Sequence, residues 1–269
     1  MDKINFSKLS GHAQQLLARI GALADEREVS IWLVGGMVRD LFLGQASLDV
    51  DIVVEGDGVA FARVLSGSFG AHLLVHKRFG TAVVTLSDGL KIDVVTARRE
   101  TYAHPGVLPD VFAGQLADDL FRRDFTINAM AVSLNARDFG AIRDDFDGRY
   151  VLEKGFVRIM HYRSFIDDPT RILRAVRYEK RFNFRCEQRT LAALKVACQE
   201  DVFRVITPVR YFHEFRRILE EADPAGPLRR LRSLDGMRFF SFGKTEEKRL
   251  DKIVKFQATT ISSSGAAED

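Results

Sequence analysis

The feature that most constrains the fold of this 269-residue chain is a change in apolar spacing near Ser164. Before that point, β-branched apolar runs of strand length alternate with turns that contain glycine or aspartate. After it, apolar residues recur at intervals of three and four, which is typical of amphipathic helices. The sequence therefore predicts a mixed sheet with flanking helices, of the α/β or α+β class, followed by a helical half.

Local patterns give these two halves more detail. A boundary is expected near residue 162, and the low-complexity segment 259–269 predicts a disordered tail. Residues 100–115 hold two prolines and two glycines, which predicts a long loop. Residues 87–89 (Ser-Asp-Gly) predict a hairpin turn. The expected strands are 31–34, 50–54, 72–76, 81–86 and 90–95, and the expected helices of this half are 9–24, 37–43 and 59–65.

Composition excludes some classes of protein. The longest apolar runs, such as 31–34, fall far short of the roughly 20 residues that cross a bilayer, so a membrane-spanning protein is excluded. The N-terminus lacks the apolar stretch of a secretory signal, so a cytoplasmic location is expected. Cys186 and Cys198 form no CxxC pair, so we expect buried thiols rather than a disulfide scaffold or a zinc site.

Charge is distributed unevenly along the chain. The whole chain has a net charge of +3, but residues 1–170 carry −4 and residues 171–255 carry +9. Such asymmetry suggests that the second part meets a polyanion and that the first part handles something that needs carboxylates. A solvated helical surface is the alternative explanation for the basic half.

The first group of chemically informative residues lies between 33 and 53. Gly35 and Gly36 follow an expected strand and begin an expected helix, where exposed N–H groups can receive a phosphate and Arg39 would add a cation. Asp49 and Asp51 lie two apart on a strand and therefore share a face. Neighbouring carboxylates repel unless a cation lies between them, and a hard divalent ion is the usual one. A common turn and a solvated Asp pair explain each motif singly, but together they favour phosphoryl or nucleotidyl transfer.

A second group is the run Arg122-Arg123-Asp124, which precedes a stretch apolar enough to be buried. Arginine beside buried sequence needs a carboxylate or a phosphate as its partner. Spacing alone favours an internal Arg–Asp ion pair and a ligand site equally.

A third group recurs every three residues along a helix expected to start at Pro169: Asp168, Arg171, Arg174 and Arg177. A solvated face or internal salt bridges would account for such a stripe. Base recognition is a more specific hypothesis, because a carboxylate accepts from the exocyclic amino group of cytosine or adenine while a guanidinium donates to ring acceptors. Such a pair would accept C and A and reject U and G.

Three motifs in order, LVGGMVRD with DVD, RRDFTINAMA and DDPTRILRAVRYEKRF, resemble the class II tRNA nucleotidyltransferase and bacterial poly(A) polymerase family. The intervening HKRFGTAVV, KIDVVTARRETY and PGVLPDV are similar to the branch with A-adding and CC-adding enzymes. This resemblance implies an α+β, polymerase-β-like catalytic head over 1–162. An all-helical neck for base recognition over 163–222 and part of an RNA-binding helical body over 223–258 would follow.

The resemblance also implies roles for single residues. Asp49 and Asp51 would hold Mg²⁺. Asp93 is a candidate third catalytic carboxylate, inferred from strand alternation, with a structural role equally open. The loop 100–115 would help to switch nucleotide specificity. The expected nucleotide-binding residues are Gly35, Gly36, Arg39, Arg123, Asp124, Asn128, Asp168, Arg171 and Arg174.

The expected function is Mg²⁺-dependent addition of C and/or A, from CTP or ATP, to the 3′ end of tRNA, with release of pyrophosphate. A poly(A) polymerase and a catalytically weak RNA- or nucleotide-binding fragment are the alternatives. Two features depart from the family: Asp167 stands where Glu is usual, and the basic helices end by about Phe256, so the chain looks short. The expected RNA-binding residues are Arg210, Arg216, Arg217, Arg229, Arg230 and Arg232.

Overall fold

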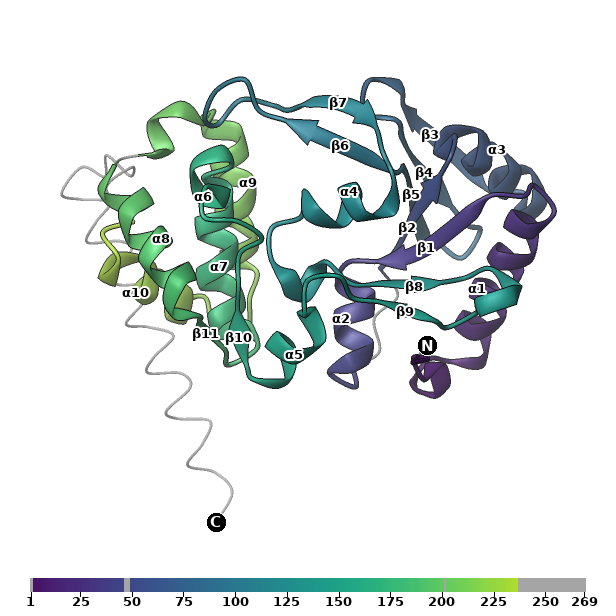
Figure 1. The fold of residues 1–269 in the computed structure, drawn as a ribbon, viewed down its shortest axis with the longest axis horizontal. Coiled ribbons are helices and arrows are strands. Elements are labelled where there is room, and N and C mark those ends of the chain that lie inside the picture. Colours follow the sequence, from purple (N-terminus) through teal and green to yellow (C-terminus); the bar gives the residue numbers. More distant parts are fainter. Residues whose placement is uncertain (1, 46–48, 201, 237–269) are drawn as a thin grey trace, which may run out of the picture. The chain divides into compact units, whose positions relative to one another are not determined.

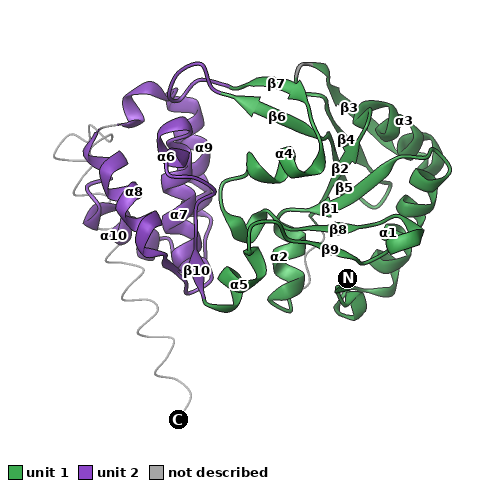
Figure 2. Ribbon diagram, viewed as in Figure 1, with its two compact units in different colours: residues 1–101, 109–154 green, residues 102–108, 155–269 purple. Residues whose placement is uncertain are grey.

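The computed structural model describes residues 2–45, 49–200 and 202–236. The chain divides into two compact units (Figure 2). Unit 1 comprises residues 1–101 and 109–154, and unit 2 comprises residues 102–108 and 155–269. The division at 154/155 precedes the head boundary expected at 162, and the functional division into head, neck and body stays a prediction. The expected tail, 259–269, lies outside the described residues.

Unit 1 is built on a seven-stranded sheet with the order β3-β4-β5-β2-β1-β8-β9 (Figure 1). The neighbours β2 and β5 run parallel, and every other neighbouring pair of this sheet is antiparallel. The expected mixed sheet and the α+β class are therefore confirmed. The strands are β1 (Ser30–Val34), β2 (Val50–Glu55), β3 (His72–His76), β4 (Thr81–Thr85), β5 (Lys91–Thr96), β8 (Ala131–Ser133) and β9 (Ile142–Arg143).

The five strands expected from β-branched runs are all present, and the turn at 87–89 joins β4 to β5 as a hairpin. The sequence did not reveal β8 and β9. These strands are only three and two residues long, too short for an alternating pattern, and β8 is held by its antiparallel register with β1. Buried branched and aliphatic side chains fill the sheet, among them Ile31, Leu33, Ile52 and Val94.

Among the described residues, five α-helices accompany this sheet. Ser10 caps the first of them by accepting from the Ala13 N–H, and the buried residues Leu16, Leu17 and Ile20 recur at helical spacing on its inner face. This first helix, α1 (Gly11–Asp25), packs against β1 and α3 (Gly58–Phe69). Helix α3 in turn covers β3, β4 and β5. The helices are α1 (Gly11–Asp25), α2 (Gly36–Phe42), α3 (Gly58–Phe69), α4 (Leu116–Phe121) and α5 (Gly148–Glu153), of which the first three were expected.

The stretch 100–115, expected to be a long loop, is partly ordered as strands. Its ends belong to β6 (Arg98–Thr101) and β7 (Asp110–Ala113), which pair antiparallel, so the loop is shorter than predicted. Alternate residues of β6 share a face, where the Glu100 carboxylate accepts from the guanidiniums of Arg98 (2.8 Å) and Arg122 (3.4 Å). These ion pairs order a segment whose prolines and glycines suggest a loop.

The described residues of unit 2 after Lys154 are mainly helical and include a pair of two-residue parallel strands, β10 (Phe156–Val157) and β11 (Arg185–Cys186). Helix α7 (Thr170–Arg181) packs against α9 (Pro208–Leu219) and α10 (Ala225–Ser233) through a face with the buried residues Ile172, Leu173 and Val176. Both cysteines are buried free thiols, as expected. Of the expected body over 223–258, only residues as far as 236 are described. The helices are α6 (Ser164–Asp167), α7 (Thr170–Arg181), α8 (Gln188–Gln199), α9 (Pro208–Leu219) and α10 (Ala225–Ser233).

Among the described helices, none combines the length and the apolar character that crossing a membrane requires.

Candidate functional site

Three carboxylates meet where β2 and β5 lie side by side. Asp49 immediately precedes β2, Asp51 is the second residue of β2, and Asp93 is its direct register partner on β5. One oxygen from each of the three residues lies within 4.8 Å of the other two. The side chains of Asp49 and Asp51 therefore point the same way, and the parallel pairing adds Asp93, whose role the sequence left open.

Burial and crowding raise the pKa of two carboxylates of this acidic cluster. Burial raises the pKa of Asp51 to about 7, with further increases from the charges of Asp49, Asp93 and Asp119, although Arg123 acts in the opposite direction. Burial and the Asp49 charge also raise the pKa of Asp93. Crowded carboxylate oxygens are the donor set that a hard divalent cation prefers. The residues present thus fit a divalent metal such as Mg²⁺.

Gly35 is required by its surroundings. Its φ of +76° lies in the left-handed region, and a Cβ at this position would lie 2.9 Å from Asp51 Oδ2 and 3.2 Å from Arg123 Nη1. It ends the turn from β1 and is the N-cap residue of α2. The groups that come close to Gly35 in this structure are the side chains of Asp51 and Arg123, and the approach of a phosphate expected at the glycines stays a prediction.

Three expected nucleotide-binding residues form one buried polar chain in unit 1. The guanidinium of Arg39 donates to the side chains of its neighbour Asp40 and of Asn128, each at 2.8 Å. Asn128 donates in turn to Asp124 Oδ1 (2.9 Å), which also accepts from the Phe125 N–H. These bonds fix the second motif beside the helix that starts at the glycines. Direct contact of Arg39, Asp124 or Asn128 with a nucleotide stays a prediction.

Arg123 does find an internal carboxylate, but the partner is Asp119 rather than the adjacent Asp124. Asp119 is fully buried on α4 and accepts from Arg122 (2.6 Å) and Arg123 (3.0 Å). Burial alone would raise the pKa of Asp119, yet the two arginines outweigh it and hold the pKa below its usual range. Sequence reasoning missed Asp119, although its spacing of three and four from the arginines is the signal of a helical ion pair.

The base-reading candidates lie in unit 2. Asp168 precedes α7 in extended conformation, and its Oδ1 accepts from Thr170 N, Thr170 Oγ1 and Arg210 Nη2. Arg171 is buried and donates to Ser164 Oγ (2.6 Å), whereas Arg174 is half-buried. The expected stripe is therefore not a solvated helical face.

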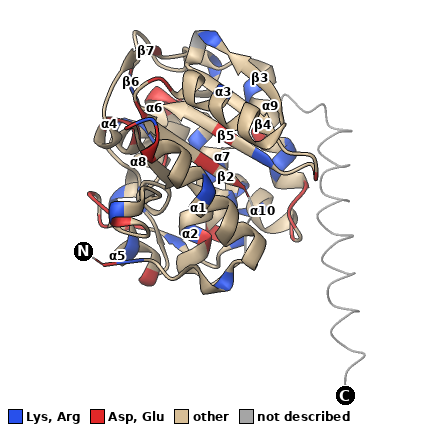
Figure 3. Cartoon of the chain, turned by 90° about the vertical axis from the view of Figure 1, so that its right-hand side faces the viewer, with Lys and Arg blue, Asp and Glu red and all other residues tan. Residues whose placement is uncertain are grey.

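Two of the arginines expected to bind RNA have internal partners. Arg210 reaches Asp168, and Arg230 forms an ion pair of 2.7 Å with the buried Glu179. Arg177, from the third motif, likewise pairs with Glu221 at 3.0 Å. Part of the positive charge of this half is thus engaged within the fold (Figure 3 colours the charged positions).

The other four arginines are exposed. Arg216 pairs along α9 with Glu220, and Arg217 lies 3.8 Å from Glu214. Arg229 lies 3.8 Å from Asp223 on the surface, and Arg232 is exposed near the end of α10. The pairs of Arg216 and Arg229 are exposed on both sides and exchange readily with other partners, and an RNA-binding role for all four arginines remains a prediction.

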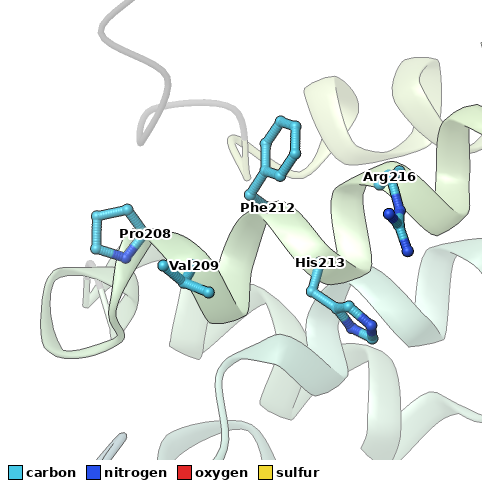
Figure 4. A pocket seen from close by; sticks show the side chains of 5 residues that line it. All are labelled: Pro208, Val209, Phe212, His213 and Arg216. Carbon is cyan, nitrogen blue, oxygen red and sulfur yellow. The ribbon is translucent and has the colours of Figure 1, made fainter.

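An open surface pocket lies on the outer side of α9 (Figure 4). Its lining is mainly apolar, with Val209 and Phe212 among the exposed large apolar side chains of the protein. Of the residues expected to function, it contains Arg216. Neither Asp168 nor Arg171 lines it, so this pocket is separate from the base-reading candidates. The lining residues are Pro208, Val209, Phe212, His213 and Arg216.

Comparisons with known proteins agree with this arrangement. Residues 31–158 match the family model described as the Poly A polymerase head domain. The A-adding tRNA nucleotidyltransferase of Halalkalibacterium halodurans is 40% identical over 261 residues, which are 94% of this chain and 61% of that protein. A similar relative from Geobacter sulfurreducens is 41% identical over 83% of this chain, but over only 26% of its own length. The chain thus spans about three fifths or less of these curated relatives.

Solved structures show the same likeness. The Thermotoga maritima CCA-adding enzyme complexed with tRNA CCA superposes with a TM-score of 0.78 at 40% identity, over 87% of this chain and 54% of that one. A tRNA nucleotidyltransferase complexed with a primer tRNA and an incoming ATP analog gives a TM-score of 0.75 at 35% identity. That match covers 91% of this chain and 70% of the other.

Proposed function

Because the chain belongs to the class II tRNA nucleotidyltransferase family, we propose that it adds C and/or A, from CTP or ATP, to the 3′ end of tRNA. Its relatives by name include A-adding and CC-adding enzymes, and relatives have been solved with tRNA and with each of the two nucleotides. The observation that carries the proposal is the cluster of Asp49, Asp51 and Asp93 beside the glycine turn. The expected location of the reaction is the cytoplasm.

The acidic cluster would hold Mg²⁺, through Asp49 and Asp51 with Asp93 beside them. When bound, such an ion stabilises the charge that develops on the phosphate oxygens as the 3′ hydroxyl displaces pyrophosphate. The chain's own contribution is positioning. Gly35 lets the Asp51 carboxylate and the Arg123 guanidinium lie close to the glycine turn, and Arg123, held by Asp119, would present a fixed positive charge to a phosphate there.

Unit 2 would select the base. Asp168 would accept from the exocyclic amino group of adenine or cytosine, and Arg171 would donate to a ring acceptor. Both side chains are already held by hydrogen bonds, from Arg210 and Thr170 on one and to Ser164 on the other. The neighbouring Asp167, in place of the usual Glu, leaves the order of nucleotides open.

The proposal is tested by offering the protein, with each labelled NTP separately, tRNA that ends before the CCA sequence, after the first C or after the second C. We expect CTP or ATP to be incorporated with Mg²⁺, and EDTA to stop the reaction. Asp51→Asn should lower the rate by about 10²- to 10³-fold, the scale on which loss of one electrostatic contact to the transition state acts. Asp88→Asn, in the β4–β5 turn, removes a charge from an exposed site and serves as the matched control.

Incorporation that survives Asp51→Asn, or none with any NTP, would contradict the proposal. ATP alone would indicate an A-adding enzyme and CTP alone a CC-adding one. Long A tails on an arbitrary RNA would instead favour a poly(A) polymerase.

A further inference from the structure

Arg210, in the first turn of α9, joins two segments that are distant from it in the sequence. Its Nη1 donates to the Gly106 carbonyl at 2.7 Å, and its Nη2 donates to Asp168 Oδ1 at 3.0 Å. The side chain of Arg210 is only 26% exposed. A planar guanidinium can bridge a carbonyl and a carboxylate in this way because its donors have fixed directions. The RNA-binding role expected for Arg210 takes no account of either contact.

The loop segment 102–108 is anchored through both backbone polar groups of Gly106. The Gly106 N–H donates to the Asp167 carbonyl at 3.1 Å, while its own carbonyl accepts from Arg210. Its φ is +73°, and a Cβ would lie 2.5 Å from Val205 Cγ2 and 2.9 Å from the Val205 carbonyl oxygen. This residue must therefore be glycine, and its position is determined by the segments that carry Asp167 and Arg210.

Asp168 is oriented by the same arrangement. Its Oδ1 receives three hydrogen bonds, from the Thr170 N–H, the Thr170 hydroxyl and Arg210. A carboxylate held by three donors on one oxygen cannot turn without losing several of them, so the direction of Oδ2 is fixed as well. Thr170 is local to Asp168, and Arg210 is the long-range member of the three.

We propose that Arg210 is a positioning residue for base selection: it couples the conformation of segment 102–108 to the orientation of Asp168. The ligand that Asp168 would read is a nucleoside triphosphate that carries an exocyclic amino group. A displacement of Gly106 would pull on Arg210 and release one of the three bonds that aim the carboxylate. This inference rests on the proposed function, in which Asp168 reads the base, and assigns Arg210 to that site instead of to the RNA backbone.

The first experiment measures discrimination. The ratio of kcat/KM for the preferred nucleotide, ATP or CTP, to that for GTP and UTP is compared in wild type, Arg210→Gln and Arg210→Lys. We expect Arg210→Gln to lower the ratio by about 10- to 100-fold, the range for losing a hydrogen bond to a charged group. Lysine keeps the charge but has a single nitrogen in place of the guanidinium fork, so Arg210→Lys should fall between the two. Arg189→Gln, an exposed site on α8, removes the same charge and should leave the ratio unchanged.

The second experiment needs no activity. Amide hydrogen exchange over residues 102–108 should be at least several-fold faster in Arg210→Gln than in wild type or Arg189→Gln, because the Gly106 anchor is lost. An unchanged discrimination ratio in an active Arg210→Gln protein, or unchanged exchange over 102–108, would overturn the proposal. If wild type incorporates no nucleotide, the proposed function fails, and the exchange measurement alone then decides whether Arg210 holds this segment.

Discussion

Two carboxylates of unit 1 are both withdrawn from water, yet their pKa values shift in opposite directions. Asp119 has two arginines within 3.0 Å, and they outweigh its burial and lower its pKa. Asp51 is flanked by Asp49 and Asp93, and its burial and these charges raise its pKa to about 7 in spite of Arg123. The fold therefore neutralises Asp119 internally, whereas burial and two neighbouring carboxylates raise the pKa of Asp51.

This contrast separates an ion-paired cluster from a cluster of like charges, for which a functional role is proposed. In a buried ion pair the mutual attraction offsets the cost of desolvation, whereas removing one partner leaves an uncompensated buried charge. A cluster of like charges lowers the stability of the metal-free protein and persists where function requires it. The two clusters share one cation, because Arg123 bonds Asp119 and also lowers the pKa of Asp51.

The largest effect on stability should follow from Asp119→Asn. The substitution leaves Arg122 and Arg123 without their buried counter-charge and should lower the free energy of unfolding by about 3 to 5 kcal/mol. Chemical denaturation at neutral pH measures this loss. Asp118→Asn removes the same charge from the next residue while keeping an acceptor for the Gln115 N–H, and it should cost far less. A loss below about 1 kcal/mol is the range of an exposed ion pair. Such a small loss for Asp119→Asn would mean that the two arginines find other partners.

The parts of this site that are close in the sequence were predictable. Gly35, Asp49 and Asp51 lie on adjoining segments, and the alternation of side chains along a strand is enough to assign both carboxylates to one face. Asp93 required the parallel pairing of β2 with β5, so alternation alone left a structural role equally open. The local sequence thus predicts the acidic pair, and the sheet topology supplies its third member.

The parts that depend on distant contacts were not predictable. The charge pattern of the sequence places Arg210 in a basic region, but it does not indicate that Gly106, 104 residues away, is its hydrogen-bond partner. The same holds for Arg230 and the buried Glu179, which are 51 residues apart. A sequence rich in arginine therefore suggests a surface for RNA, even though some of these arginines form ion pairs within the fold.

A smaller, pH-dependent effect is expected from Asp51→Asn in metal-free buffer. Because the pKa of Asp51 is about 7 in the folded state and near 3.8 when unfolded, its protonated form favours folding at low pH. That contribution is lost as the pH rises through 7, and the neutral Asn does not lose it. Between pH 5 and pH 8.5, wild type should lose about 3 kcal/mol relative to the variant, because the folded carboxyl alone stays protonated over the roughly two pH units below its pKa and one such unit corresponds to about 1.4 kcal/mol.

Mg²⁺ should reverse the effect of high pH on the stability of wild type relative to Asp51→Asn. Titration of Mg²⁺ at pH 8.5 should stabilise wild type, because a ligand that binds only the folded state raises the free energy of unfolding. Asp51→Asn should gain little. Two results would contradict the distinction between the two clusters. One is a difference in stability between wild type and Asp51→Asn that stays constant from pH 5 to pH 8.5, and the other is equal stabilisation of both proteins by Mg²⁺.

The smallest effect should come from an ion pair that belongs to neither cluster. Arg149 and Glu153 pair at 3.1 Å across one turn of α5, with side chains 46% and 61% exposed. Water and salt screen such a pair, so Glu153→Gln should change the free energy of unfolding by about 0.5 kcal/mol or less. Measured under the conditions used for Asp119→Asn, it sets the baseline for one lost carboxylate. If it cost as much as Asp119→Asn, burial would not be what distinguishes the two ion pairs, and the contrast between Asp119 and Asp51 would need another cause.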